Sequence, residues 1–342
     1  EALKKAAEHG IFGYSDSRAD YFSALYSWYA SRFGWDIQPE WLIKTPGVVY
    51  ALATAVRALT QKGDAIMIQQ PVYYPFASII RHNDRVLVDS PLVLENGVYR
   101  MDYEDIESHI IEKKVKLFLL CSPHNPVGRV WSKEELIRLG DICMKHGVIV
   151  VSDEIHADFV YPGHQHFVFA NLKPEYLMRT ITCTAPSKTF NLAGLKVSNI
   201  FIADAALRKA FTSEMWAGGV SDINVLGLVA CQAAYTHGAD WLEELKLYLA
   251  DNISLVRTFL AERIPQIRLI EPQGTYLLWL DFRALGMTDA ELDTLITDKA
   301  KLWLDPGTMF GPEGSGFQRI NIACPRAILQ RALEQLDKAI NG

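Results

Sequence analysis

Residues 148–156 read Val-Ile-Val-Val-Ser-Asp-Glu-Ile-His, a β-branched run that ends in polar residues. The four apolar residues at 148–151 predict a strand that is covered on both faces, as the strands of parallel sheets are. Similar short apolar runs lie on both sides of it, at 65–68, 85–88, 116–121, 180–184 and 199–203. Helical patterns separate these runs, so the sequence predicts an α/β fold built on a mostly parallel sheet.

Helix signals agree with this alternation. An aromatic-rich helix is expected at 19–33, and another begins just after Gly47. Ser132 and Glu135 form a capping box at the start of a later helix, and Gly147 suits its C-terminal cap.

The pattern changes after a helical run at 241–263. Short strands are expected at 267–270, 275–281, 302–304 and 318–323, and with two helices they make a smaller α+β unit. We therefore predict an N-terminal segment at 1–40, a large domain at 41–250 and a small C-terminal domain at 251–342, with the boundary near Ala250.

The composition narrows the function. The chain has 342 residues, 49% of them hydrophobic, and a net charge of -6. A chain of this length can bury a hydrophobic core in each of two domains. It has no basic face and no apolar run that could span a bilayer, so nucleic acid and membrane are not expected partners. Its five cysteines and the histidines at 156, 164 and 166 lack metal-site spacing, so we expect no metal and the reduced thiols of a cytoplasmic protein.

Three polar residues come directly after predicted strands. They are Asn125 in Ser-Pro-His-Asn-Pro, Asp153 in the opening stretch, and Lys188 in Ala-Pro-Ser-Lys-Thr-Phe-Asn. Ligands of an open α/β sheet gather at the carboxyl ends of its strands, so these side chains should share one crevice. An amine, a carboxylate and an amide together suit pyridoxal phosphate: lysine forms the imine, and a carboxylate keeps the ring nitrogen protonated.

These motifs resemble the fold type I pyridoxal-phosphate enzymes, the aspartate aminotransferase superfamily, and within it the cystathionine beta-lyase or cysteine-S-conjugate beta-lyase group. The likeness runs from about Gly10 to the C-terminus. It implies that Lys188 is the Schiff-base lysine, that Asp153 binds the pyridine nitrogen and that Asn125 binds the phenolate oxygen. It also implies that Tyr73 stacks on the cofactor ring.

The resemblance implies further contacts. Arg319, in Phe-Gln-Arg-Ile-Asn, matches the arginine that binds the substrate α-carboxylate, and Tyr74 lies beside Tyr73 near the substrate. Tyr14 resembles a tyrosine that such enzymes lend from the neighbouring subunit, which requires a homodimer. The cofactor phosphate is expected on the helix start after Pro46 and on two further side chains, namely at Gly47, Val48, Val49, Ser187 and Lys196.

Two positions depart from the family pattern. Ala185 stands where many aminotransferases have a serine, so Ser187 has to supply any hydroxyl needed there. His156 stands where a tyrosine is common, and it is assigned to the cofactor side of the site. The chain also begins inside the family pattern, after the N-terminal arm that helps to cover the site.

The resemblance favours β-elimination from S-substituted L-cysteines such as cystathionine. Lys188 would remove the Cα proton, and Tyr73 or Tyr74 would guide protons near the leaving group. Aminotransferases share every step up to the carbanion, so an aminotransferase stays open as an alternative. A regulatory ligand-binding protein on the same fold is a second alternative, although no helix-turn-helix extension is present.

Overall fold

The computed structural model describes all 342 residues and confirms an α/β protein with a mostly parallel sheet. Seven strands lie in the order β1-β9-β8-β7-β6-β2-β3, and β9 alone runs antiparallel to its neighbours. Their bounds are β1 Leu42–Thr45, β2 Ala65–Ile68, β3 Val86–Asp89, β6 Leu117–Cys121, β7 Ile149–Asp153, β8 Thr180–Thr184 and β9 Ser198–Phe201.

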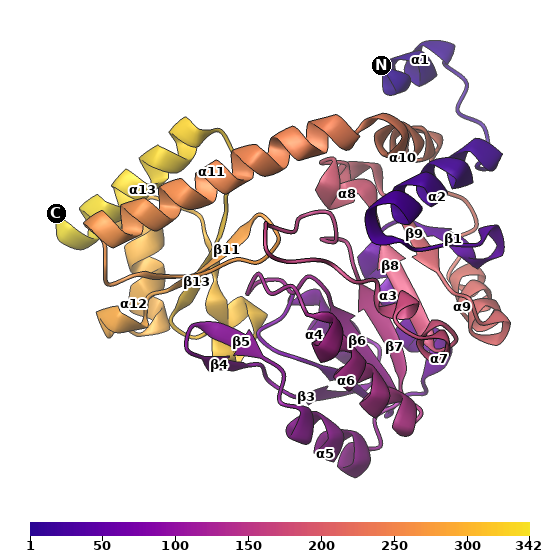
Figure 1. Cartoon of the computed structure of the whole chain (residues 1–342), viewed down its shortest axis with the longest axis horizontal. Helices are drawn as coiled ribbons and strands as arrows, with labels where there is room; N and C mark the ends of the chain where they lie inside the picture. Colours follow the sequence, from indigo (N-terminus) through magenta and orange to yellow (C-terminus); the bar gives the residue numbers. More distant parts are fainter.

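Helices cover both faces of this sheet (Figure 1). Successive residues of β6 show why its sequence is apolar throughout: Leu119 packs in a core with α3 and α4, whereas Leu120 packs in a core with α5 and α6. The helices of this part of the chain are α1 Ala2–His9, α2 Ala19–Phe33, α3 Val48–Leu59, α4 Pro75–His82, α5 Tyr103–Lys113, α6 Lys133–Lys145, α7 Pro174–Leu177, α8 Pro186–Thr189, α9 Ala205–Ala217 and α10 Val225–His237.

A second, antiparallel sheet forms the smaller unit, coloured orange to yellow in Figure 1. Its order is β10-β11-β13-β12, and the helices α12 and α13 accompany it. The bounds are β10 Arg268–Ile270, β11 Leu277–Asp281, α12 Asp289–Thr294, β12 Asp305–Pro306, β13 Phe317–Asn321 and α13 Arg326–Asn341.

A single long helix, α11 (Ala239–Arg263), links the two units. It crosses the top of the molecule in Figure 1 and lies beside α13. Ala250, where the sequence predicts the domain boundary, lies inside this helix. The division at that residue therefore stays a prediction. Neither α11 nor any other helix is both long and apolar enough to cross a membrane.

Several local predictions need correction. The strand expected at 302–304 is absent, because the chain turns out to solvent at Trp303, which is 94% exposed, and pairs with β13 only from Asp305. The strand expected at 199–203 is present as β9, and it runs antiparallel to β8. Two features had no predicted counterpart: β1, and the hairpin of β4 (Val93–Glu95) and β5 (Val98–Arg100).

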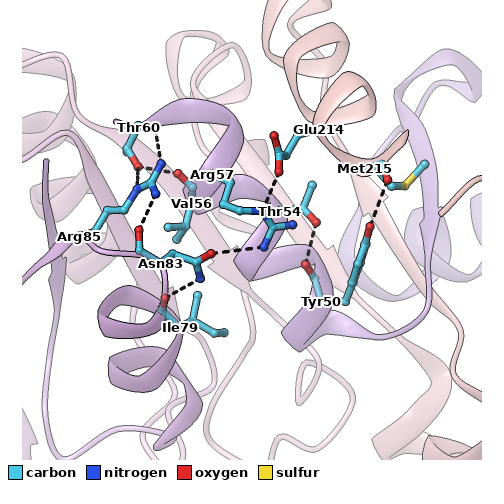
Figure 2. A network of polar contacts seen from close by, with 10 residues as sticks. All are labelled: Tyr50, Thr54, Val56, Arg57, Thr60, Ile79, Asn83, Arg85, Glu214 and Met215. Carbon is cyan, nitrogen blue, oxygen red and sulfur yellow. Dashed lines mark hydrogen bonds and ion pairs between the residues drawn. The ribbon is translucent and has the colours of Figure 1, made fainter. Parts of the chain in front are cut away.

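A polar network holds α3 against its neighbours, as Figure 2 shows. Arg57 donates from Nε to Glu214 of α9 at 2.6 Å and from Nη1 to Asn83 at 3.4 Å. Arg85 donates from Nη2 to the carbonyl oxygen of Thr60, the residue after α3, at 2.5 Å. These contacts fix the C-terminal half of α3 against α9 and against the segment before β3.

Candidate active site

The carboxyl ends of three neighbouring parallel strands bring Asn125, Asp153 and Lys188 together. Cys121 of β6 pairs with Asp153 of β7, and Asp153 pairs with Cys183 of β8. Asn125 and Lys188 follow β6 and β8 by four residues each. The strand-end rule applied to the sequence therefore places all three side chains at one edge of the sheet.

Asp153 is buried, with 4% of its surface exposed. Its Oδ1 accepts one hydrogen bond, from the backbone N–H of Ile155 at 3.2 Å. Burial raises the pKa of this carboxyl to about 7, although the Ile155 N–H and the positive charge of Lys188 act in the opposite direction. A cationic partner at this carboxylate would relieve the cost of its burial.

Lys188 lies in the single turn of α8 and is half-buried. Burial lowers the pKa of its amine, the nearby Arg319 lowers it further, and the Asp153 carboxylate raises it. The net direction is downward, so the amine gives up its proton more readily than a surface lysine does.

Arg319 reaches the same site from β13 of the second sheet. Its Nε and Nη2 donate to Oδ2 of Asp305 at 3.0 and 2.6 Å, and its Nη1 donates to Oδ1 of Asn125 at 2.8 Å. The guanidinium also lies 4.6 Å from the centre of the Phe310 ring. Three hydrogen bonds thus fix a planar cation beside residues of the large sheet.

His156 is buried at this site without any hydrogen bond to its side chain. Burial lowers the pKa of the imidazole to about 3, and the charges of Lys188 and Arg319 act in the same direction. The ring lies 5.9 Å from that of Tyr276. His156 is therefore a neutral imidazole that has unused hydrogen-bonding capacity.

Two tyrosines precede α4. Tyr73 is half-buried, and burial raises the pKa of its hydroxyl to about 12, so it stays protonated near neutral pH. Its ring centre lies 5.3 Å from that of Tyr74, which is exposed. The negative charge of Asp153 also raises the pKa of Tyr73, which places the Tyr73 hydroxyl within electrostatic reach of the site.

The start of α3 offers an anion site. Gly47 has a φ of +118°, a conformation that suits glycine, and the backbone N–H groups of Val48 and Val49 have no partner. Gly47 and Lys196 each lie two residues beyond the Thr45–Ser198 pair of β1 and β9, so both flank the same strand ends. The free N–H groups and the helix dipole favour an anion here.

The remaining predicted residues differ in their placement. Ser187 is half-buried in α8, next to Lys188. Tyr14 is 98% exposed and lies in the segment between α1 and α2. The single chain does not bring Tyr14 into the cluster.

Comparison with known proteins identifies the family of the chain. A family model of aminotransferases class I and II matches residues 1–336. The chain belongs to this family.

Relatives in the family include carbon-sulfur lyases. The chain is 43% identical to cystathionine beta-lyase PatB of Bacillus subtilis (strain 168), over 100% of its own length and 88% of that protein. Cystalysin from Treponema denticola, whose crystal structure contains pyridoxal 5'-phosphate, has a TM-score of 0.97 and 40% identity, covering 99% of this chain and 86% of cystalysin. The PLP-bound C-S lyase from Staphylococcus hominis has a TM-score of 0.94 and 33% identity, covering 100% of this chain and 87% of the lyase.

Sequence reasoning missed several residues that contact the side chains of this cluster. Asp305 holds Arg319, Phe310 lies against the guanidinium, and Tyr276 faces His156. Asp305 and Arg319 are register partners of β12 and β13, so a correct strand at 305–306 would have revealed the first of these contacts.

Proposed function

We propose that this chain is a pyridoxal-phosphate-dependent C–S β-lyase, which cleaves S-substituted L-cysteines such as cystathionine to a thiol, pyruvate and ammonia. The cluster of Lys188, Asp153, Asn125 and Arg319 carries the proposal, because it combines an amine, a buried carboxylate, an amide and a fixed carboxylate-binding cation. The relationship to cystathionine beta-lyase PatB and to C-S lyases of known structure supports the same activity.

The residues present fit the cofactor. Asp153 accepts only one hydrogen bond, both ring nitrogens of His156 are unpartnered, and two N–H groups at the start of α3 are free. When bound, pyridoxal phosphate supplies an electron sink that stabilises a carbanion at the substrate Cα. The charges of the site also match those of the cofactor. The Asp153 carboxylate can pair with a protonated ring nitrogen, and the free backbone N–H groups of α3 can bind a phosphate.

Each residue has a proposed task in holding this group. Lys188 binds it covalently through its amine, and the Asp153 carboxylate pairs with the pyridine nitrogen. Asn125 donates to the phenolate oxygen from Nδ2, which is free because its Oδ1 is the atom that accepts from Arg319. Tyr73 covers one face of the ring, and His156 borders it. The phosphate is assigned to Gly47, Val48, Val49, Ser187 and Lys196.

Arg319 orients the substrate. A guanidinium has five N–H donors. Three of them are used by Asp305 and Asn125, so one on each terminal nitrogen is left to bind the α-carboxylate. A carboxylate held in this way directs Cα toward Lys188, whose lowered pKa makes its amine a competent base for the Cα proton.

The elimination needs no second substrate, because the electron pair released at Cα is balanced by the pair that leaves with the sulfur. The Cα–H bond and the Cβ–S bond break, the sulfur leaves with its electron pair, and Tyr73 or Tyr74 guides a proton to it. The remaining 2-aminoacrylate reacts with water to give pyruvate and ammonia. Because burial keeps the Tyr73 hydroxyl protonated, it is a suitable donor at neutral pH.

One assay tests the assignment. The purified protein, saturated with pyridoxal phosphate, is incubated with cystathionine or S-benzyl-L-cysteine and no 2-oxo acid, and pyruvate and thiol are measured. Equal amounts of both products support elimination. Turnover that starts only when a 2-oxo acid is added would instead identify an aminotransferase, which shares the chemistry up to loss of the Cα proton.

The proposed enzyme is a homodimer that shares its active sites. Tyr14 is 98% exposed in the single chain, and Ile11 and Phe12 beside it are exposed as well. Figure 1 shows α1 standing away from the body of the molecule near α10, as expected of a segment that packs on a second subunit. Light scattering should give about twice the mass of one chain. All five cysteines are free thiols, which suits the proposed cytoplasmic location.

A further inference from the structure

A pocket of about 330 Å³ opens on the side of Lys188 that faces α11. Trp241 and Leu245 of α11 line it on one side, and Phe159 and Tyr276 line it on another. We infer that this pocket receives the sulfur substituent of the substrate and selects uncharged, apolar substituents over charged ones. The inference rests on the proposed lyase function and adds its substrate class.

The position of the pocket supports this use. Lys188, the proposed base at Cα, forms part of its wall. Asn321 also lines it, and Asn321 lies two residues after Arg319 on the same face of β13. Residues so spaced on a strand are about 7 Å apart. A cysteine derivative with its carboxylate on Arg319 and its Cα at Lys188 therefore has its sulfur at the mouth of this pocket.

The walls are mostly aromatic and aliphatic. The rings of Phe159 and Tyr276 meet edge to face with their centres 4.9 Å apart. Burial raises the pKa of Tyr276 to about 12 and that of the Cys324 thiol above its usual value, so both are neutral at pH 7. Lys188 is the one lining residue that carries a formal charge.

Arg326, the residue after the lining residue Pro325, is paired with other groups. Arg326 donates from Nη2 to Asp251 at 3.1 Å, and its guanidinium lies 5.0 Å from the centre of the Tyr248 ring. Apart from Lys188, whose amine is already assigned to the cofactor and the Cα proton, the pocket walls offer no counter-ion to the distal ammonium and carboxylate of cystathionine, and the desolvation of these groups is costly. A benzyl or alkyl group would instead gain apolar and edge-to-face contacts.

Two thioethers with the same reacting bond test the inference. We expect kcat/KM for S-benzyl-L-cysteine to exceed that for L-cystathionine by about tenfold or more. Leu245→Trp fills the pocket, so it should lower kcat/KM for the benzyl substrate about tenfold and change that for cystathionine by less than about threefold. Leu247→Trp is the matched control, because Leu247 lies on the solvent side of the same helix and is 72% exposed. It should leave the ratio of the two substrates unchanged.

An inhibition constant measures binding in the pocket separately from any effect of the substitution on the chemical step. N-acetyl-S-benzyl-L-cysteine keeps the carboxylate and the benzyl group but has a blocked amine, so it should act as a competitive inhibitor. Its inhibition constant should rise about tenfold in Leu245→Trp and stay constant in Leu247→Trp. Leu245→Ala, which removes bulk, should raise relative kcat/KM for a larger naphthylmethyl thioether even if the tryptophan variant does not fold.

The outcomes separate the two proposals. If the wild-type enzyme cleaves both thioethers but neither Leu245 variant alters their ratio, the pocket inference is overturned and the lyase assignment stands. If the wild-type enzyme cleaves no thioether, the proposed function itself fails.

Discussion

Asp153 and Arg319 face one site from two different sheets, yet the first accepts a single hydrogen bond and the second makes three. Asp153 is a buried carboxyl group without a cation in direct contact, whereas Arg319 is paired with Asp305 before any ligand arrives. In the proposed function, the large-sheet side is completed by the cofactor. The small-sheet side has its proposed carboxylate-binding cation fixed before the substrate binds. Changes on the first side should affect cofactor retention, and changes on the second should affect substrate recognition alone.

The largest effect is expected at Lys188, to which we assign both the attachment of the cofactor and the base at Cα. Lys188→Ala should abolish the visible imine absorbance and lower lyase turnover about 10⁴-fold or more, because it removes the covalent attachment and the base together. Absorbance spectra and pyruvate release measure the two losses. Lys196→Ala is the control, since it should weaken cofactor binding but keep the absorbance once saturated. A Lys188→Ala protein that kept both properties would overturn the assignment.

The next test removes the fixed cation of the small sheet. Arg319→Ala should lower kcat/KM by about 10²- to 10³-fold, because one partner of a charge-assisted contact is lost. The imine absorbance should remain, since no cofactor contact is assigned to Arg319. Arg283→Ala is a suitable control: Arg283 also pairs with a small-sheet aspartate, Asp281, but its charge lies largely in solvent. Loss of cofactor absorbance in Arg319→Ala would contradict the proposed separation of the two sides.

The same contrast explains what the sequence could predict. Asn125, Asp153 and Lys188 follow strands that are recognisable from a few adjacent apolar residues, and parallel strands bring their carboxyl ends together whatever the details of the loops. The surroundings of Arg319 and His156 depend on pairing over longer distances. Asp305 meets Arg319 through strand register, and Tyr276 meets His156 across 120 positions of chain. The sequence immediately around Arg319 or His156 therefore does not predict these contacts.

Asp153 should make the stability of the cofactor-free protein depend on pH. Its pKa in the folded protein, about 7, lies above the ordinary value of 3.8, so the folded state keeps the proton up to a higher pH than the unfolded state does. The contribution of Asp153 to the free energy of unfolding therefore falls as pH rises from about 4 to about 7. Asp153→Asn should be more stable than the wild-type apoprotein by about 2–4 kcal/mol at pH 8, and nearly equal to it at pH 4.

Urea unfolding at the two pH values measures this difference. His156 titrates in the opposite sense, because its folded pKa of about 3 lies below the ordinary value, but it is present in both proteins and its contribution largely cancels. Pyridoxal phosphate provides the control. It should reverse the order at pH 8, since the ionised carboxylate then has a cationic partner. If Asp153→Asn were the less stable apoprotein at pH 8, the carboxylate would have to be matched within the chain already.

The smallest effect is expected at Asp305, which acts on the substrate only through Arg319. Asp305→Ala should raise KM about tenfold and change kcat by less than about twofold, because a carboxylate contact is made equally before and during the reaction. Asp305→Asn retains an oxygen that can accept from Nε and Nη2, so it should restore most of the lost affinity. Glu271→Gln, which alters an exposed glutamate paired with Arg257, should change neither constant. A lower KM in Asp305→Ala would mean that Asp305 competes with the substrate for the guanidinium, and the small-sheet side would then need a ligand to complete it, as the large-sheet side does.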